Sequence, residues 1–348
     1  MEKIRLGKTE MMVSKLGFGG IPIQRLVDDE AVAVVRRCLD LGVTYIDTAN
    51  GYTTSEERIG KAISGRREEL ILATKTLALT NEGVERDLTL SLKRLCVESI
   101  DLYQFHGVNS FKALETVLDP KGPRTVLEKA KRTGTIKHIG ITSHSMDVGK
   151  EAVKTDRFET IMFPLNFITN EAVNELLPLC REHDVGFIAM KPLAGGMLDN
   201  AVIAFKYLFQ FPGIIPIPGI QEIHEIEEII RALEGPWEMT EAEQQEMQRL
   251  REELGTRFCR RCQYCQPCTE EIPIQTVMIS RSFVRRQTPE RFFSGDLSDA
   301  MEKAANCTEC GNCEERCPYH LPIREMIAEH VEWYQGEKKK YLEQIASR

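Results

Sequence analysis

Residues 28–49 read DDEAVAVVRRCLDLGVTYIDTA, and this stretch contains one complete unit of the expected fold. Its first part is acidic at the start and then carries apolar residues at helical spacing. Its last seven residues, VTYIDTA, form a short apolar run with β-branched residues, which is typical of a buried strand. A helix followed directly by such a strand is typical of a parallel sheet that is covered by helices.

The same alternation of strand and helix runs from residue 15 to about residue 233. Eight such units predict the α/β class and a (β/α)8 TIM barrel. A doubly wound open sheet is the alternative, and it is less favoured because no GxGxxG follows a strand. Ahead of the first strand, residues 4–14 predict a hairpin at the barrel floor. The eight strand-like runs are KLGFGG (15–20), VTYIDTA (43–49), LILATK (70–75), DLYQFHG (101–107), IKHIGIT (136–142), TIMFPLN (160–166), GFIAMKP (186–192) and GIIPIPG (213–219).

Charge and hydropathy exclude some classes of function. The net charge of −8 argues against broad binding to nucleic acid or to an anionic membrane. No apolar run is long enough to cross a bilayer, and the charged start MEKIRLGKTE predicts no signal peptide, so the expected compartment is the cytoplasm.

The charges also indicate a domain boundary. Acidic and basic residues balance over 256–348, so the acidic excess lies upstream. We expect a barrel over residues 1–238, a connecting helix over 239–255 and a second domain over 256–348.

Polar residues follow three neighbouring strands of the expected barrel. Asp47 and Tyr52 lie in DTANGY, Lys75 ends ATK, and His106 lies in QFHG. Each residue alone is more often a turn, surface or core residue, but the strand ends of a barrel meet at its catalytic face. A lysine cation stabilises a tyrosinate, a carboxylate keeps the lysine charged, and an imidazole can orient a carbonyl. The set predicts proton transfer to a carbonyl oxygen while hydride arrives at carbon.

Residues 1–235 resemble the aldo-keto reductase family. The resemblance is carried, in order, by LGFGG, DTANGYTTSEERIGKAI, ATK, DLYQFHG, HIGIT, PLAGG and PIPG. It implies a small carbonyl substrate and a nicotinamide cofactor, NAD(H) or NADP(H), bound without a Rossmann fold. It also implies that Tyr52 is the general acid/base, that Lys75 and Asp47 tune it, and that His106 orients the carbonyl.

The resemblance further implies a set of cofactor-binding residues, with some departures. Met162 stands where a glutamine for the carboxamide is expected, and Met190 stands where an aromatic residue stacks on the nicotinamide. Gly219 and Glu225 stand where basic residues would grip a 2′-phosphate, and the nearby carboxylates of Glu222 and Glu225 would repel it, which favours NAD over NADP without deciding between them. The implied residues are Thr142, Ser143 and Asn166 at the carboxamide, Pro192, Leu193, Gly195 and Gly196 at the pyrophosphate, and Glu228 near the adenine.

Eight of the eleven cysteines fall in two runs, CRRCQYCQPC (259–268) and CTECGNCEERCP (307–318). The second run has the ferredoxin spacing for a 4Fe-4S cluster, in which the fourth cysteine ligates the other cluster. The first run departs from the pattern, since Thr269 stands where proline is usual. Zinc is a less favoured alternative, and disulfides are rare in the cytoplasm. The predicted groups are Cys259, Cys262, Cys265 with Cys317, and Cys307, Cys310, Cys313 with Cys268.

The three remaining cysteines, Cys38, Cys96 and Cys180, are predicted to be buried core residues. The helical segments around the second run resemble the α-helical ferredoxin modules of fumarate reductase-type iron-sulfur subunits. A barrel joined to such a dicluster module resembles a subfamily of aldo-keto reductases.

The expected function is therefore an oxidoreductase that reduces an aldehyde or ketone, or oxidises the alcohol, and carries two 4Fe-4S clusters. The alternative is an iron-sulfur electron-transfer protein whose barrel binds a partner or an unusual substrate. The Arg-rich stretch RSFVRRQTPER (281–291) could dock an acidic redox partner protein, although internal ion pairs are the commoner use of such residues.

Overall fold

The computed structural model describes residues 1–284 and 289–346, which form two compact units. Unit 1 spans Met1–Gln244 and unit 2 begins at Gln245. The division falls inside helix α10 (Glu241–Gly255). Thr240 caps this helix, since its hydroxyl accepts a hydrogen bond from the Glu243 amide at 3.2 Å.

Unit 1 contains an eight-stranded parallel sheet in which neighbours in the chain are neighbours in space. The ring closes between its first and last strands, where the Gly19 amide donates to the Pro218 carbonyl at 2.8 Å. Glycine is required here, because a Cβ at Gly19 would lie 2.7 Å from that oxygen. The predicted (β/α)8 barrel is confirmed. Its strands are β3 (Gly17–Gly19), β4 (Tyr45–Asp47), β5 (Ile71–Thr76), β6 (Ile100–Phe105), β7 (Ile136–Thr142), β8 (Thr160–Pro164), β9 (Gly186–Met190) and β10 (Ile214–Ile217).

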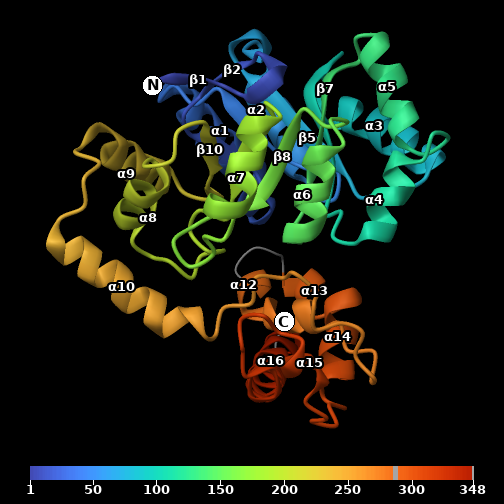
Figure 1. The fold of residues 1–348 in the computed structure, drawn as a ribbon, viewed down its shortest axis with the longest axis vertical. Helices are drawn as coiled ribbons and strands as arrows, with labels where there is room; N and C mark the ends of the chain where they lie inside the picture. The colour runs from blue at the N-terminus through green and yellow to red at the C-terminus, as the bar shows by residue number, and fades with distance from the viewer. Residues whose placement is uncertain (285–288, 347–348) are drawn as a thin grey trace. The chain divides into compact units, whose positions relative to one another are not determined.

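Helices follow the strands and flank the sheet (Figure 1). Helix α1 (Asp28–Asp40) illustrates the local logic. Three acidic residues in its first turn favour the positive end of the helix dipole, and Val34, Val35 and Cys38 bury its apolar face. The other helices of the barrel are α2 (Ser55–Ile63), α3 (Asn81–Leu95), α4 (Phe111–Leu118), α5 (Arg124–Arg132), α6 (Met146–Lys154), α7 (Ala172–Glu182), α8 (Ala201–Leu208) and α9 (Ile223–Glu234).

The expected hairpin is formed by β1 (Lys3–Arg5) and β2 (Met12–Ser14), which pair antiparallel. Leu6 and Val13 of this hairpin are buried in one apolar cluster with strand residues such as Leu102 and Ile188. The barrel interior is therefore a filled core at this end, which leaves the opposite end of the strands for chemistry.

The described residues of unit 2 form helices joined by the two cysteine loops. Its core is built from apolar side chains that include Phe292, Met301, Ile327 and Tyr334, and it also contains Cys317. The helices after α10 are α11 (Ile274–Met278), α12 (Ser280–Val284), α13 (Pro289–Phe292), α14 (Asp296–Ala304), α15 (Asn312–Glu315) and α16 (Ile323–Ala346).

The prediction for the isolated cysteines is right for two of them. Cys38 and Cys180 are buried, but Cys96 is exposed. Cys96 ends α3 in a left-handed conformation with φ of 54°, so it lies beyond the last buried turn of that helix.

Part of the Arg-rich stretch, residues 285–288, lies outside the described residues. Arg281 lies over the Trp333 ring at 5.5 Å, which is an internal contact. In the part of the chain that the structure describes, no helix combines the length and apolarity that a membrane span needs.

Candidate functional site

The four predicted catalytic residues come together at the carboxyl ends of three adjacent strands. Asp47 is the last residue of β4, Lys75 lies near the end of β5, and His106 directly follows β6. Tyr52 stands on the turn between β4 and α2. Its ring meets the His106 ring edge-on at 5.7 Å between centroids, and the Lys75 ammonium lies 5.2 Å from the Tyr52 ring centroid.

A buried ion pair lies at the centre of this group. The Lys75 Nζ atom donates to Asp47 Oδ1 at 2.5 Å and to the Thr48 carbonyl at 2.6 Å, and both charged side chains are almost fully buried. Burial lowers the pKa of Lys75, but the Asp47 carboxylate outweighs it, so that the pKa is raised above its usual value. Burial raises the pKa of Asp47, which Lys75 opposes. The lysine is therefore a cation at neutral pH.

Gln104 is a member of the site that sequence reasoning missed. Its Nε2 atom donates to Asp47 Oδ2 at 3.3 Å, so each carboxylate oxygen of Asp47 has a partner. The alternation of side chains along a strand could have identified it from the sequence. Gln104 lies two residues before His106, and alternate residues of a strand point to the same face.

Backbone hydrogen bonds fix the turn that carries Tyr52. The Asn50 amide donates to the Lys75 carbonyl at 3.0 Å, and the Tyr52 amide donates to Ala49 at 2.9 Å. The position of the tyrosine thus depends on both β4 and β5.

The residues predicted at the nicotinamide carboxamide follow β7 and β8, and they hold loops together. Thr142 Oγ1 accepts from the Gly107 amide at 2.7 Å. Ser143 Oγ donates to Asn109 Oδ1 at 3.4 Å. Asn166 Nδ2 donates to the Lys191 carbonyl at 2.9 Å, and its Oδ1 accepts from the Thr169 amide at 2.8 Å.

Donors nevertheless remain at this place. The Thr142 hydroxyl acts there as an acceptor and keeps its own proton for donation, and the Asn166 amide has a second N–H. These residues therefore fit a carboxamide, with fewer side-chain partners than the family pattern implies.

The predicted pyrophosphate loop follows β9. Its turns are closed by the Ala194 amide on the Lys191 carbonyl at 2.9 Å and by the Gly196 amide on the Leu193 carbonyl at 2.8 Å. Gly195 and Gly196 both have positive φ, of 79° and 89°. The loop contains the four predicted residues, Pro192, Leu193, Gly195 and Gly196.

The predicted adenine contact, Glu228, is half-buried on α9. The amino end of that helix is capped by its own acidic residues. Glu225 Oε2 accepts from the Gln221 and Glu222 amides at 2.6 and 2.8 Å, and the Glu222 side chain accepts in return. A carboxylate already occupies the anion-binding end of α9, which disfavours a phosphate there.

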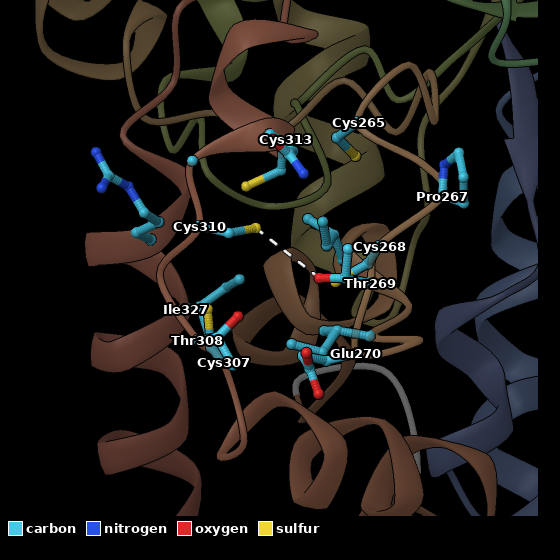
Figure 2. A pocket seen from close by; sticks show the side chains of 15 residues that line it. Cys265, Pro267, Cys268, Thr269, Glu270, Cys307, Thr308, Cys310, Cys313 and Ile327 are labelled. Atoms are coloured by element: carbon cyan, nitrogen blue, oxygen red, sulfur yellow. Dashed lines mark hydrogen bonds between the residues drawn. The ribbon is translucent and has the colours of Figure 1, made fainter.

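The eight clustered cysteines of unit 2 line two pockets. One pocket is lined by Cys259, Cys262, Cys265 and Cys317, here called set A. The other is lined by Cys268, Cys307, Cys310 and Cys313, here called set B, and Cys265 also reaches it (Figure 2). The structure brings together the groups that the spacing predicts, three cysteines from one run and one from the other.

The thiols of set A influence one another. Burial raises the pKa of Cys265 to about 12, and the neighbouring Cys259, Cys262 and Cys317 add to this rise. Iron must therefore replace a firmly held proton, as expected for thiolate ligands.

Two contacts fasten the runs together. The Arg260 guanidinium lies 4.1 Å from the Tyr319 ring centroid, and Arg316 Nη1 donates to the Pro267 carbonyl at 2.7 Å. Within residues 1–284 and 289–346, no three Cys, His, Asp or Glu side chains are close enough to share one metal ion.

Comparisons with known proteins agree with both units. Residues 15–202 match the model of the aldo/keto reductase family, and residues 258–322 match that of a 4Fe-4S dicluster domain. The chain belongs to the aldo-keto reductase family.

Similar proteins align with the barrel of this aldo-keto reductase. The uncharacterized oxidoreductase YqkF of Bacillus subtilis is 30% identical over 214 residues, which cover 58% of this chain and 67% of that protein. L-galactose dehydrogenase of Arabidopsis thaliana is 31% identical over 214 residues, covering 56% and 66%. The matched part is thus about two thirds of either relative.

Among solved structures, the holo form of aldo-keto reductase AKR11C1 from Bacillus halodurans superposes with a TM-score of 0.62 at 26% identity. The superposition covers 72% of this chain and 96% of that chain.

The buried ion pair leads to a stability prediction. Asp47→Asn leaves the Lys75 ammonium buried without a counter-charge, so we expect the barrel to lose about 3–5 kcal/mol of unfolding free energy at neutral pH. Burial would then lower the Lys75 pKa below its unfolded value, so the deficit should shrink as pH rises toward about 10. Trp237 fluorescence in urea, in a Trp333→Phe background, reports on unit 1, because these are the two tryptophans of the chain.

A matched control is Asp184→Asn. Asp184 pairs with Arg5 at 2.7 Å, but both side chains are nearly half exposed, so the expected change is within about 1 kcal/mol. Equal losses of unfolding free energy in Asp47→Asn and Asp184→Asn would contradict the argument that burial of the Asp47–Lys75 pair makes it important for stability.

The cysteine grouping of the aldo-keto reductase predicts a pattern of iron loss. Cys259→Ser combined with Cys317→Ser removes two ligands of set A, so the double variant should keep about four irons per chain. Cys259→Ser combined with Cys268→Ser affects both sets and should keep close to none. Iron and acid-labile sulfide are measured after anaerobic purification, with the exposed Cys96→Ser as the control that keeps all iron. The opposite pattern would mean that each run encloses its own cluster.

Proposed function

We propose that this protein reduces an aldehyde or ketone, or oxidises the corresponding alcohol, at Asp47, Tyr52, Lys75 and His106, with a nicotinamide as the hydride carrier. The observation that carries the proposal is the buried Lys75–Asp47 pair beside the Tyr52 ring, which in turn meets His106. Membership of the family supports the class of reaction.

The proposed roles follow from charge and position. Tyr52 gives its hydroxyl proton to the carbonyl oxygen, and the Lys75 cation stabilises the negative charge left on the phenolic oxygen. Asp47 keeps Lys75 charged in its buried position, and Gln104 holds the second oxygen of Asp47. His106 donates to the carbonyl oxygen and orients it toward Tyr52. In the oxidative direction the same groups accept the proton.

A nicotinamide would be held by Thr142, Ser143 and Asn166 at its carboxamide, by Pro192–Gly196 at its pyrophosphate and by Glu228 near its adenine. When bound it supplies or accepts hydride. The remaining donors of Thr142 and Asn166 support this assignment, and the carboxylates of Glu222 and Glu225 at the start of α9 support NAD over NADP.

We also propose two 4Fe-4S clusters in unit 2, one held by set A and one by set B. The match to a 4Fe-4S dicluster domain and the two four-cysteine pockets support them. Such clusters pass one electron at a time. Their redox partner would be a small electron-transfer protein.

The proton-donor role of Tyr52 is tested by Tyr52→Phe. The substitution keeps the ring between Lys75 and His106 and removes the hydroxyl, so we expect kcat to fall by about 10²- to 10⁴-fold. Turnover is measured anaerobically with NADH and either methylglyoxal or benzaldehyde.

Tyr45→Phe is the matched control, because Tyr45 is a fully buried tyrosine of the barrel floor. It should keep near wild-type turnover, and both variants should keep their iron. Full turnover in Tyr52→Phe would refute the proposed catalysis.

A second candidate function is electron transfer, with a barrel that binds a partner or an unusual substrate. The complete cysteine sets of unit 2 and the loop-holding hydrogen bonds of Ser143 and Asn166 favour it. Anaerobic addition of NADH or NADPH, with the visible cluster absorption recorded, separates the two. Bleaching by dithionite together with no binding of either nucleotide would favour electron transfer. Tight nucleotide binding would favour carbonyl reduction.

A further inference from the structure

The two cysteine sets differ in their exposure. Cys317 of set A is buried in the core of unit 2, with 6% of its surface exposed. Cys310 of set B is the one exposed cysteine of the eight, and the remaining six are half-buried. A cluster held by set B therefore has an edge at the surface of unit 2, whereas one held by set A is enclosed more deeply.

The two crossing cysteines differ in the residue that follows each of them. Cys268 is followed by Thr269, whereas Cys317 is followed by Pro318. Thr269 lines the set B pocket, and Pro318 lines the set A pocket. The two residues occupy corresponding places, but only threonine carries a side-chain hydrogen-bond donor.

The donor of Thr269 lies beside the exposed cysteine. Thr269 Oγ1 lies 3.9 Å from Cys310 Sγ, within hydrogen-bonding distance for sulfur (Figure 2). An iron-bound thiolate has no proton, so in the loaded protein the hydroxyl donates to the sulfur. A hydrogen bond to a charged acceptor strengthens as the charge on the acceptor grows.

We propose that the set B cluster is the electron port of unit 2, and that Thr269 makes this cluster easier to reduce by donating to Cys310 Sγ. The inference rests on the proposed clusters of unit 2. A one-electron donor loses one electron and the cluster gains it, with no bond formed or broken and no proton moved. The added electron increases the negative charge on the sulfurs, so the Thr269 hydrogen bond stabilises the reduced state more than the oxidised one.

The pocket walls give the electron a next step. Cys265 and Ile274 line both pockets, so the two sites share a wall. An electron that entered at the exposed edge near Cys310 would therefore have a neighbouring site in set A to pass to. Thr269 would raise the driving force for the entry step.

The test compares Thr269→Val, Thr269→Ser and wild type by EPR-monitored potentiometry with dithionite, after iron has been measured. Valine keeps the shape of threonine and removes the donor. We expect one of the two clusters in Thr269→Val to become about tenfold harder to reduce, which corresponds to about 59 mV for a one-electron couple. Serine keeps the hydroxyl and should restore the wild-type midpoint. Thr276→Val is the matched control, because Thr276 lies on α11 of the same unit and lines neither pocket.

A water-soluble dysprosium chelate is added in the same experiment. The chelate should enhance the relaxation of the two EPR signals unequally. The signal whose midpoint shifts in Thr269→Val should show the stronger enhancement, because the port cluster is the exposed one. Unchanged midpoints in Thr269→Val with about eight irons per chain, or stronger relaxation of the other signal, would overturn the electron port alone. Wild-type protein without iron-sulfur signals would overturn the proposed clusters and this inference with them.

Discussion

The salt bridge between Asp47 and Lys75 is the interaction on which the barrel site depends. Burial of two charges costs several kcal/mol for each ion, and this cost is offset only where the geometry is good and the remaining hydrogen-bonding groups are satisfied. Here the Thr48 carbonyl accepts a second hydrogen bond from Lys75, and Gln104 donates one to the second oxygen of Asp47. Because a well-packed apolar pair would stabilise the same place as well, stability alone does not account for the ions. The proposed proton transfer from Tyr52 would account for them, since a fixed cation beside the ring stabilises the phenolate that such a transfer leaves.

Unit 2 depends on a different constraint. Each cysteine set takes members from two runs that lie about forty residues apart, so neither set forms unless the whole unit folds. Its helices α11, α12 and α13 have only five, five and four residues, too few to persist on their own. Binding of iron to preformed ligand sets contributes folding free energy in such domains. The contacts Arg260–Tyr319 and Arg316–Pro267 also hold the two cysteine runs next to each other, without any contribution from iron.

The barrel could be predicted from sequence because its strands are buried on both sides along most of their length and read as short apolar runs. Residues at strand ends then meet at one rim by topology, which brought Asp47, Lys75 and His106 together without any distance information. The partner that a polar side chain takes cannot be read in this way. Gln104 was missed because glutamine is common in strands and at surfaces. The hydrogen bonds by which the Asn166 side chain joins the loops after β8 and β9 could not be read from the sequence either.

The errors at the cysteines have the same origin. Cys96 has apolar neighbours in sequence, but it follows the last turn of α3, where periodicity no longer gives its direction. The grouping of the other eight followed from spacing because ligands to one cluster must converge. The hydrogen bond between Thr269 and Cys310 did not, since it joins residues 41 positions apart through the fold of both loops.

The reactions proposed for the two units move different numbers of electrons. The geometry of the barrel site bears on whether the two reactions can be coupled. Hydride carries two electrons, whereas a 4Fe-4S cluster passes one. In the proposed reaction, however, the groups at the barrel rim act on protons and charge: Tyr52 would give the proton, Lys75 would stabilise its loss, and His106 faces Tyr52. None of these roles requires the electrons to arrive as a pair, because negative charge develops on the carbonyl oxygen in either case and calls for the same proton. The site at Tyr52 is therefore compatible with both sources of electrons, and the choice between them lies with the residues proposed to hold a nucleotide and with the potentials of the proposed clusters.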